Sequence, residues 1–123
     1  MVVVLDTNFI LEMVKEKVDF LDIENYGKIL IPRLVLAELD KVRREAGLKD
    51  RGLAELALKI IEKIKDRVSF IELDKKFVDA GIIDYSSKNK EVIVATIDRD
   101  LKKELAGKAR ILTLVNRKKL VLL

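Results

Sequence analysis

Two apolar segments of this chain end directly in an aspartate. The run "VVVL" at residues 2–5 is followed by Asp6, and "EVIVATI" at residues 91–97 is followed by Asp98. Continuous apolar runs of this length are typical of strands buried on both faces of a parallel sheet. In open α/β sheets the functional crevice lies outside the carboxyl ends of the strands, where the strand order reverses. If the two strands are neighbours, these carboxylates face each other in that crevice.

A glutamate interrupts the apolar face of a predicted helix. The segment "RLVLAELDKVRREAG" (33–47) has helical periodicity, with Leu34, Ala37, Val42 and Ala46 near one face. Glu38 lies four residues from both Leu34 and Val42, so its side chain belongs to that face and not to the solvated one. The helix follows a predicted strand, which places Glu38 beyond the end of that strand.

Asp79 is the fourth acid that points to a shared site. It precedes Ile82 and Ile83 by three and four residues, so it also begins on a buried helix face. Carboxylates held close together repel one another unless a cation lies between them. Hard cations such as Mg²⁺ and Mn²⁺ prefer oxygen ligands. Four acids from distant segments therefore predict a divalent-metal site.

Each of these acids also has a purely structural interpretation. Asp6 could cap the helix that follows it, a role for which Thr7 or Asn8 competes, and Asp98 could likewise be a cap. Glu38 could pair on the surface with Lys41, and Asp79 could compensate a helix dipole. The remaining acids near these motifs are interpreted as ordinary polar or supporting groups, or as solvated surface: Asp84, Asp100, Asp40, Asp50 and Asp66.

The elements that must position these acids alternate along the chain. Strands are predicted at residues 2–5, 27–32, 68–73, 91–97 and 109–115, and helices at 33–47, 50–65, 75–88 and from Asp98 to Gly107. Strands that alternate with helices imply an α/β fold with a parallel sheet covered on both faces. The 123 residues suit a single domain spanning 1–123. The tail "KKLVLL" has no assigned place.

Composition restricts the chemistry further. The chain contains neither cysteine nor histidine, which excludes disulfides, thiolate or imidazole metal sites, cysteine nucleophiles and Ser-His-Asp triads. No apolar stretch approaches the ~20 residues of a membrane span, and no signal peptide is visible, so we expect a cytoplasmic protein without a membrane partner. A net charge of +4, from 25 basic and 21 acidic residues, leans mildly towards an acidic partner.

Four segments together resemble the PIN (PilT N-terminal) domain nucleases: "VVLDTNFI", "LVLAELDKV", "FVDAGIIDYS" and "VIVATIDRDL". The likeness extends over essentially the whole chain and is strongest to small archaeal-type members related to ribosomal RNA processing nucleases and VapC-type toxins. It implies a three-layer α/β/α sandwich around a parallel sheet of about five strands. It also implies a divalent-metal endoribonuclease that acts on single-stranded RNA.

By position, the resemblance assigns roles to individual residues. Asp6, Glu38, Asp79 and Asp98 match the acidic, metal-binding quartet, and Asp100 matches an additional metal-binding acid. Asn8 and Thr96 match the small polar residues that support the quartet. Some related nucleases carry two consecutive aspartates at the third acidic position, where this chain has Asp79 followed by alanine. Asp84 is then a candidate substitute or assistant for Asp79.

Physical chemistry supports the implied mechanism. Carboxylates alone would repel a phosphodiester, so the acids must act through metal. One or two Mg²⁺ or Mn²⁺ ions, about 3.5–4 Å apart if two, can activate a water and stabilise the leaving 3′-oxygen. The products would carry 5′-phosphate and 3′-hydroxyl ends. Basic residues near the expected cleft offer phosphate contacts or, alternatively, are solvated helix faces paired with Glu45 and Glu104: Lys41, Arg43, Arg44, Arg99 and Lys102.

Other classes fit less well. A haloacid-dehalogenase-type phosphatase would need a second aspartate where Asn8 stands, a receiver domain would need an acidic pair that is absent, and no GxxxxGK[ST] run exists for a P-loop hydrolase. The main competitor is a PIN-like module that binds RNA or protein through a weak or silent site. The resemblance also leaves a homodimer, an antitoxin or a ribosome-assembly partner as expected associations.

Overall fold

A six-stranded sheet forms the centre of the protein. The computed structural model describes residues 1–116 and 118–123. The strands lie in the order β3-β2-β1-β4-β5-β6, and all neighbouring pairs are parallel except β5 and β6, which are antiparallel. In chain order they are β1 (Val2–Leu5), β2 (Lys28–Pro32), β3 (Val68–Ile71), β4 (Val92–Ala95), β5 (Arg110–Val115) and β6 (Lys119–Leu122).

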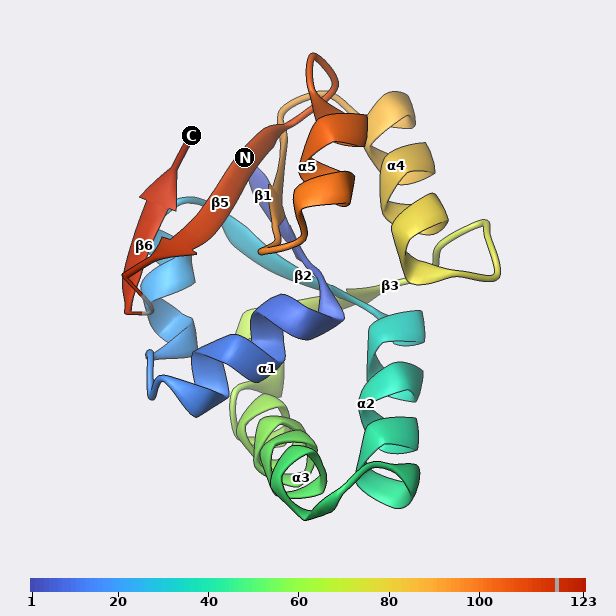
Figure 1. Cartoon of the computed structure of the whole chain (residues 1–123). Coiled ribbons are helices and arrows are strands. Elements are labelled where there is room, and N and C mark those ends of the chain that lie inside the picture. Colours follow the sequence, from blue (N-terminus) through green and yellow to red (C-terminus); the bar gives the residue numbers. More distant parts are fainter. Residues whose placement is uncertain (117) are drawn as a thin grey trace.

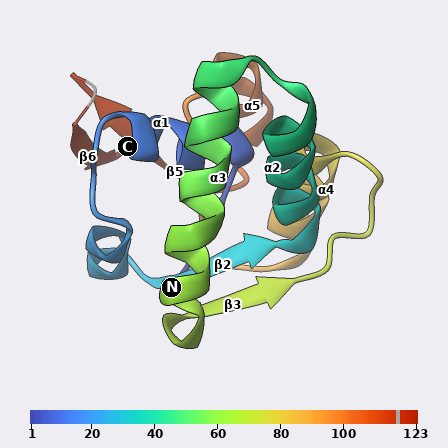
Figure 2. The same cartoon turned by 90° about the horizontal axis from the view of Figure 1, so that it is seen from below.

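Helices cover both faces of this sheet. The first three pack against one another on one face, and α4 and α5 pack together on the other (Figures 1 and 2). This arrangement confirms the predicted three-layer α/β fold. The α-helices are α1 (Thr7–Lys15), α2 (Arg33–Glu45), α3 (Leu48–Lys63), α4 (Val78–Lys88) and α5 (Arg99–Leu105), and the 3-10 helices are η1 (Phe20–Asn25) and η2 (Lys65–Arg67).

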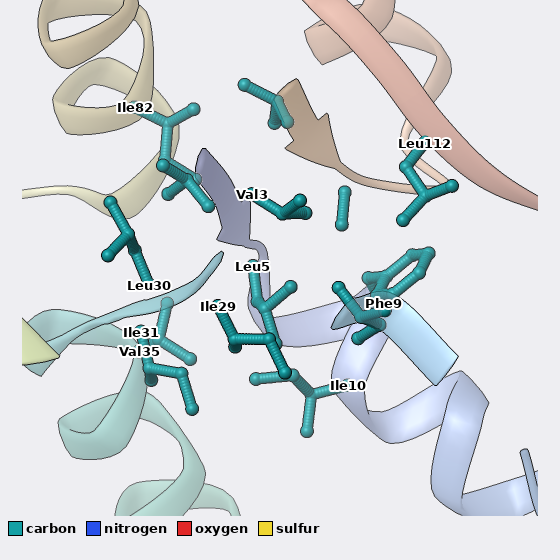
Figure 3. Close-up of a cluster of buried hydrophobic side chains, with 14 of the residues drawn as sticks. Val3, Leu5, Phe9, Ile10, Ile29, Leu30, Ile31, Val35, Ile82 and Leu112 are labelled. Carbon is teal, nitrogen blue, oxygen red and sulfur yellow. The ribbon is translucent and has the colours of Figure 1, made fainter. Parts of the chain in front are cut away.

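The core explains why the first strand is apolar at every position. Val3, Val4 and Leu5 of β1 have no exposed surface, because successive side chains point to opposite faces and helices cover each face. Figure 3 shows Val3 and Leu5 among buried side chains from the neighbouring elements, including Phe9 and Ile10 of α1. Burying a large apolar side chain contributes about 1.5–3 kcal/mol, so the centre of the sheet is a rigid platform for the residue that follows β1.

The carboxyl-terminal segment adds a strand that the sequence pattern did not place. Lys119–Leu122 forms β6, which pairs antiparallel with β5. The sheet is therefore mixed and has one strand more than the five parallel strands expected. The reversal is possible because only three residues separate β5 from β6, a connection that suits a hairpin and is too short for a parallel crossover.

The buried face of α2 differs from the predicted one. Val35 and Leu39 are fully buried, whereas Leu34 and Val42 are half-buried and Ala37 is exposed. The helix packs against both β2 and α3, so its line of burial is rotated relative to the stripe expected from periodicity. Glu38, which the periodicity placed on the buried face, is exposed as a result, although it precedes the buried Leu39.

The α-helices are short. The longest of them, α3, has 16 residues. Within residues 1–116 and 118–123 no helix combines the length and the apolar character needed to cross a bilayer.

Candidate active site

An acidic pocket lies at the carboxyl ends of β1 and β4. β1 pairs with β2 on one side and with β4 on the other, so the strand order reverses beside β1. This is the place where open α/β sheets form functional crevices. The pocket has a volume of about 310 Å³ and is lined by Asp6, Thr7, Asn8, Glu38, Phe77, Val78, Asp79 and Asp98.

Asp6 is the most buried acid of the pocket, with 4% of its surface exposed. Its Oδ1 accepts a hydrogen bond from the Thr7 backbone N–H (2.9 Å), and its Oδ2 accepts one from the Thr96 hydroxyl (2.9 Å). The pKa of Asp6 is raised to about 6, chiefly because the carboxyl is buried. The hydrogen bond from Thr96 lowers this pKa, and repulsion from Asp79 and Asp98 raises it further. The carboxylate is thus held in one orientation at an electrostatic cost.

Thr96 connects the two aspartates that follow the strands. Its hydroxyl donates to Asp6 and accepts from the backbone N–H of Asp98 at 3.0 Å. Asp98 in turn caps α5, because its Oδ1 accepts from the backbone N–H groups of Asp100 (2.8 Å) and Leu101 (3.2 Å). The capping interpretation of Asp98 is therefore correct as far as it goes, but the same residue also lines the acidic pocket.

Glu38 and Asp79 reach the pocket from helices on opposite faces of the sheet. Glu38 Oε1 accepts a hydrogen bond from the Thr7 hydroxyl at 2.5 Å, which ties α2 to the first turn of α1. Asp79 lies in the first turn of α4 and is exposed, so the prediction that it starts on a buried helix face is wrong; Val78, Gly81 and Ile82 form that face. Burial raises the pKa of Asp79, and the negative charges of Asp98 and Glu38 raise it further. Asp79 is thus near enough to Asp98 and Glu38 for their charges to disfavour its ionisation.

Two other acids from the sequence analysis lie outside the lining of the pocket. Asp84 is half-buried, and its Oδ2 forms an ion pair with Lys88 Nζ at 3.1 Å. Asp100 is exposed and reaches Asp98 through its backbone N–H alone. Asn8 does line the pocket and is exposed. The geometry therefore favours Asp79 over Asp84 as the third acid.

The basic residues proposed to contact RNA are absent from the lining of the pocket. Arg43 and Arg44 both bind Asp40, at 2.6 Å and 3.0 Å, and hold the pKa of that carboxyl below its usual value. The alternative of a solvated helix face paired these bases with Glu45. In the structure, Arg43 and Arg44 pair with Asp40 instead. Of the other three, Lys41 of α2 and Arg99 of α5 are exposed, and Lys102 of α5 is half-buried.

Three lining residues were not predicted as site residues: Thr7, Phe77 and Val78. Thr7 was considered only as a rival helix cap, whereas its hydroxyl orients Glu38. Phe77 was not considered, although it lines the pocket and 74% of its surface is exposed. A signal existed for Phe77, because a large apolar residue stands between two lysines and the "VDAG" segment.

The donor set of the pocket fits a hard divalent cation. Four carboxylates line it, the lining contains no lysine or arginine, and two of the acids have raised pKa values. Among the described residues no three acids converge closely enough to form a preformed ligand cage. Mg²⁺ sites of this kind are usually completed by water and substrate phosphate, with only one or two carboxylates per ion, so an open pocket is the expected form.

An α/β/α sandwich with carboxylates at the strand switch point defines the class to which this chain belongs. Residues 3–118 match the PIN like domain family, and the chain is a member of it.

Two individual relatives agree with that assignment. The chain is 32% identical over 109 residues to ribonuclease VapC4 of Methanocaldococcus jannaschii, covering 84% of this chain and 81% of that protein. It also superposes on the structure of the PIN domain endonuclease Utp24 with a TM-score of 0.74 and 28% identity, covering 95% of this chain and 87% of that one. The predicted family is thereby confirmed.

Proposed function

We propose that this protein is an endoribonuclease that hydrolyses RNA phosphodiester bonds with Mg²⁺ or Mn²⁺. The observation that carries the proposal is the convergence of Asp6, Glu38, Asp79 and Asp98 on one pocket at the switch point of the sheet. Membership of the PIN-like family and the likeness to a ribonuclease support RNA as the substrate. The four acids would hold one or two ions.

Hydrogen bonds within the chain would position the carboxylates that hold the metal. Bound metal would supply positive charge at the phosphate and lower the pKa of an attacking water. Thr96 and the Thr7 amide fix the carboxylate of Asp6, and the Thr7 hydroxyl fixes that of Glu38. Hydrolysis would leave a 5′-phosphate and a 3′-hydroxyl.

Cleavage of end-labelled single-stranded RNA tests the proposal. We expect cutting with Mg²⁺ or Mn²⁺ and none in excess EDTA. Asp6→Asn should slow cutting by more than about 100-fold, because even groups that only support a metal ligand contribute about 10- to 100-fold. Asp66→Asn is the control, since Asp66 is exposed in η2 and does not line the pocket. Undiminished cutting in EDTA would refute the proposal.

A paired comparison assigns the third acid. Asp79 lines the pocket, whereas Asp84 is bound to Lys88. We therefore expect Asp79→Asn to abolish cleavage and Asp84→Asn to leave most of it. The reverse result would exchange the two roles.

The resemblance implies two physiological roles that differ in their partners. A toxin would bind an antitoxin, and expression of the active chain, but not of Asp6→Asn, would arrest growth. A ribosomal RNA processing nuclease would bind ribosome-assembly factors, and its deletion would leave unprocessed precursor RNA. Sedimentation of the purified chain tests the proposed homodimer.

A further inference from the structure

Phe77 is exposed at the edge of the acidic pocket. All six aromatic residues of the chain are described, and Phe77 is the only one in the exposed class, with 74% of its surface accessible. By contrast, Phe9 and Phe20 belong to the core, and Phe70 lies against the guanidinium of Arg33. A single exposed apolar residue needs no explanation by itself. This one, however, lines the pocket that holds four carboxylates.

The loop that carries Phe77 is anchored at both ends. Val78, the first residue of α4, is 4% exposed. Leu73 packs so closely against Gly81 that a Cβ added there would lie 2.8 Å from its side chain. The intervening loop projects beside α4 in Figure 1. Phe77 is therefore exposed between two packed positions, two residues before Asp79.

Two lysines stand directly before Phe77 in the loop. Lys75 and Lys76 precede it and are exposed, and neither takes part in an ion pair within residues 1–116 and 118–123. The loop also carries two acids, and each is paired with a base outside it: Glu72 with Arg33 at 3.0 Å and Asp74 with Lys88 at 3.4 Å. An aromatic ring next to free cations is the combination with which proteins bind single-stranded nucleic acid, since the ring stacks on a base and the cations hold phosphates.

We propose that Phe77 forms a stacking subsite for an unpaired nucleobase of the RNA strand whose phosphate enters the acidic pocket, with Lys75 and Lys76 contacting neighbouring phosphates. This inference rests on the proposed function and assigns a residue to the single-strand preference that the family resemblance implies. A base inside a duplex is already stacked on both sides and offers no free face to the ring, so the subsite selects single-stranded RNA. Stacking tolerates every base, so it selects strandedness and not sequence.

A tryptophan at this position reports stacking directly. The chain contains no tryptophan, so Phe77→Trp introduces a unique emitter. In an Asp6→Asn background with Mg²⁺, which prevents turnover, single-stranded oligouridylate should quench the emission, and an RNA duplex at equal phosphate concentration should quench it far less. Leu56→Trp in the same background is the control, because Leu56 is also exposed (49%) but lies on α3. Its emission should respond to neither RNA.

Binding of the single strand gives a second measurement. Phe77→Ala should weaken it by about 5- to 140-fold, the range for losing one base–aromatic stack. Phe77→Tyr should retain parent affinity, whereas Phe77→Leu, which keeps an apolar side chain without a ring, should behave like Phe77→Ala. Parent-like binding by Phe77→Leu, or equal quenching by duplex and single strand, would overturn the proposal.

The two proposals fail separately. If the parent cleaves RNA but oligouridylate leaves the emission of the Phe77→Trp variant unquenched, the stacking subsite is wrong, the nuclease assignment stands, and Phe77 is available to a protein partner instead. If quenching is strong and specific for single strands but the parent cuts no RNA, the stacking subsite stands and the chain is a binding module.

Discussion

Asp6 has an ionisation cost that a stability measurement can detect. Burial raises its folded-state pKa to about 6, above the ordinary 3.8. The folded state therefore binds more protons than the unfolded state between about pH 4 and 6, and the contribution of Asp6 to stability falls as the pH rises through that range. Each pKa unit corresponds to about 1.4 kcal/mol, so the loss is on the order of 2–3 kcal/mol.

We expect Asp6→Asn to show this cost by difference. In EDTA the variant should be more stable than the parent at pH 7, and the gain should vanish near pH 4, where the parent carboxyl is protonated. An asparagine can keep both contacts, accepting from Thr7 through its oxygen and donating to the Thr96 hydroxyl through its amide. Urea unfolding at several pH values measures the effect. Asp6 is also the N-cap of α1, and a variant less stable than the parent at pH 7 would show that this capping role outweighs the cost of its charge.

Thr96 holds Asp6 and the Asp98 backbone with one hydroxyl, so its removal should affect both. Thr96→Val keeps the shape of the side chain but leaves Asp6 Oδ2 without this donor and the Asp98 N–H without this acceptor. Each polar group left unsatisfied costs about 1–3 kcal/mol when it is buried. The Thr96 bond lowers the pKa of Asp6, so that pKa should rise further. Thr96→Ser keeps the hydroxyl and should restore activity and the pH profile. A Thr96→Val protein with a parental pH profile would remove Thr96 from the site.

The position of α4 depends on the absence of a side chain at Gly81. A Cβ there would lie 2.8 Å from both Cβ and Cδ1 of Leu73, so the helix or the preceding segment would have to move. We expect Gly81→Ala to lower the melting temperature and, by displacing Asp79, to reduce cleavage. Gly52→Ala in α3 is the matched control, because its Cβ meets nothing within 4 Å. That change should stabilise the protein by up to about 1 kcal/mol and leave cleavage unaltered.

A stable Gly81→Ala protein with normal activity would show that α4 can shift without consequence for the site. Circular dichroism melting and the RNA cleavage assay, run on both alanine variants, separate these outcomes.

The whole molecule should respond to metal through the same pocket. A ligand that binds only the folded state at ten times its dissociation constant contributes about 1.4 kcal/mol, which corresponds to a rise of roughly 3–8 °C in melting temperature for a domain of this size. We expect Mg²⁺ or Mn²⁺ to raise the melting temperature of the parent and to have a smaller effect on Asp6→Asn. Calorimetry in EDTA and in tens of millimolar metal measures it. No shift in the parent would contradict a metal site.

The sequence by itself determined the order of the elements and the place of two acids. Period-two and helical patterns follow from backbone geometry and can be read locally. A continuous apolar run such as residues 2–5 also shows that the strand is buried on both faces. Asp6 was therefore correctly placed at a strand end, whereas β4 ends at Ala95 and Asp98 follows after Thr96 and Ile97 as the cap of α5. The α/β class followed from the alternation of strands and helices.

Only the tertiary structure decided which side chains meet. The crossovers put β4 beside β1, which brings Asp98 near Asp6. The packing of α2 against β2 and α3 turns Glu38 towards Thr7. The anchoring of α4 selects Asp79 for the pocket while Asp84 pairs with Lys88. These contacts join residues from separate elements, and local periodicity carries no information about the rotation or pairing of whole elements.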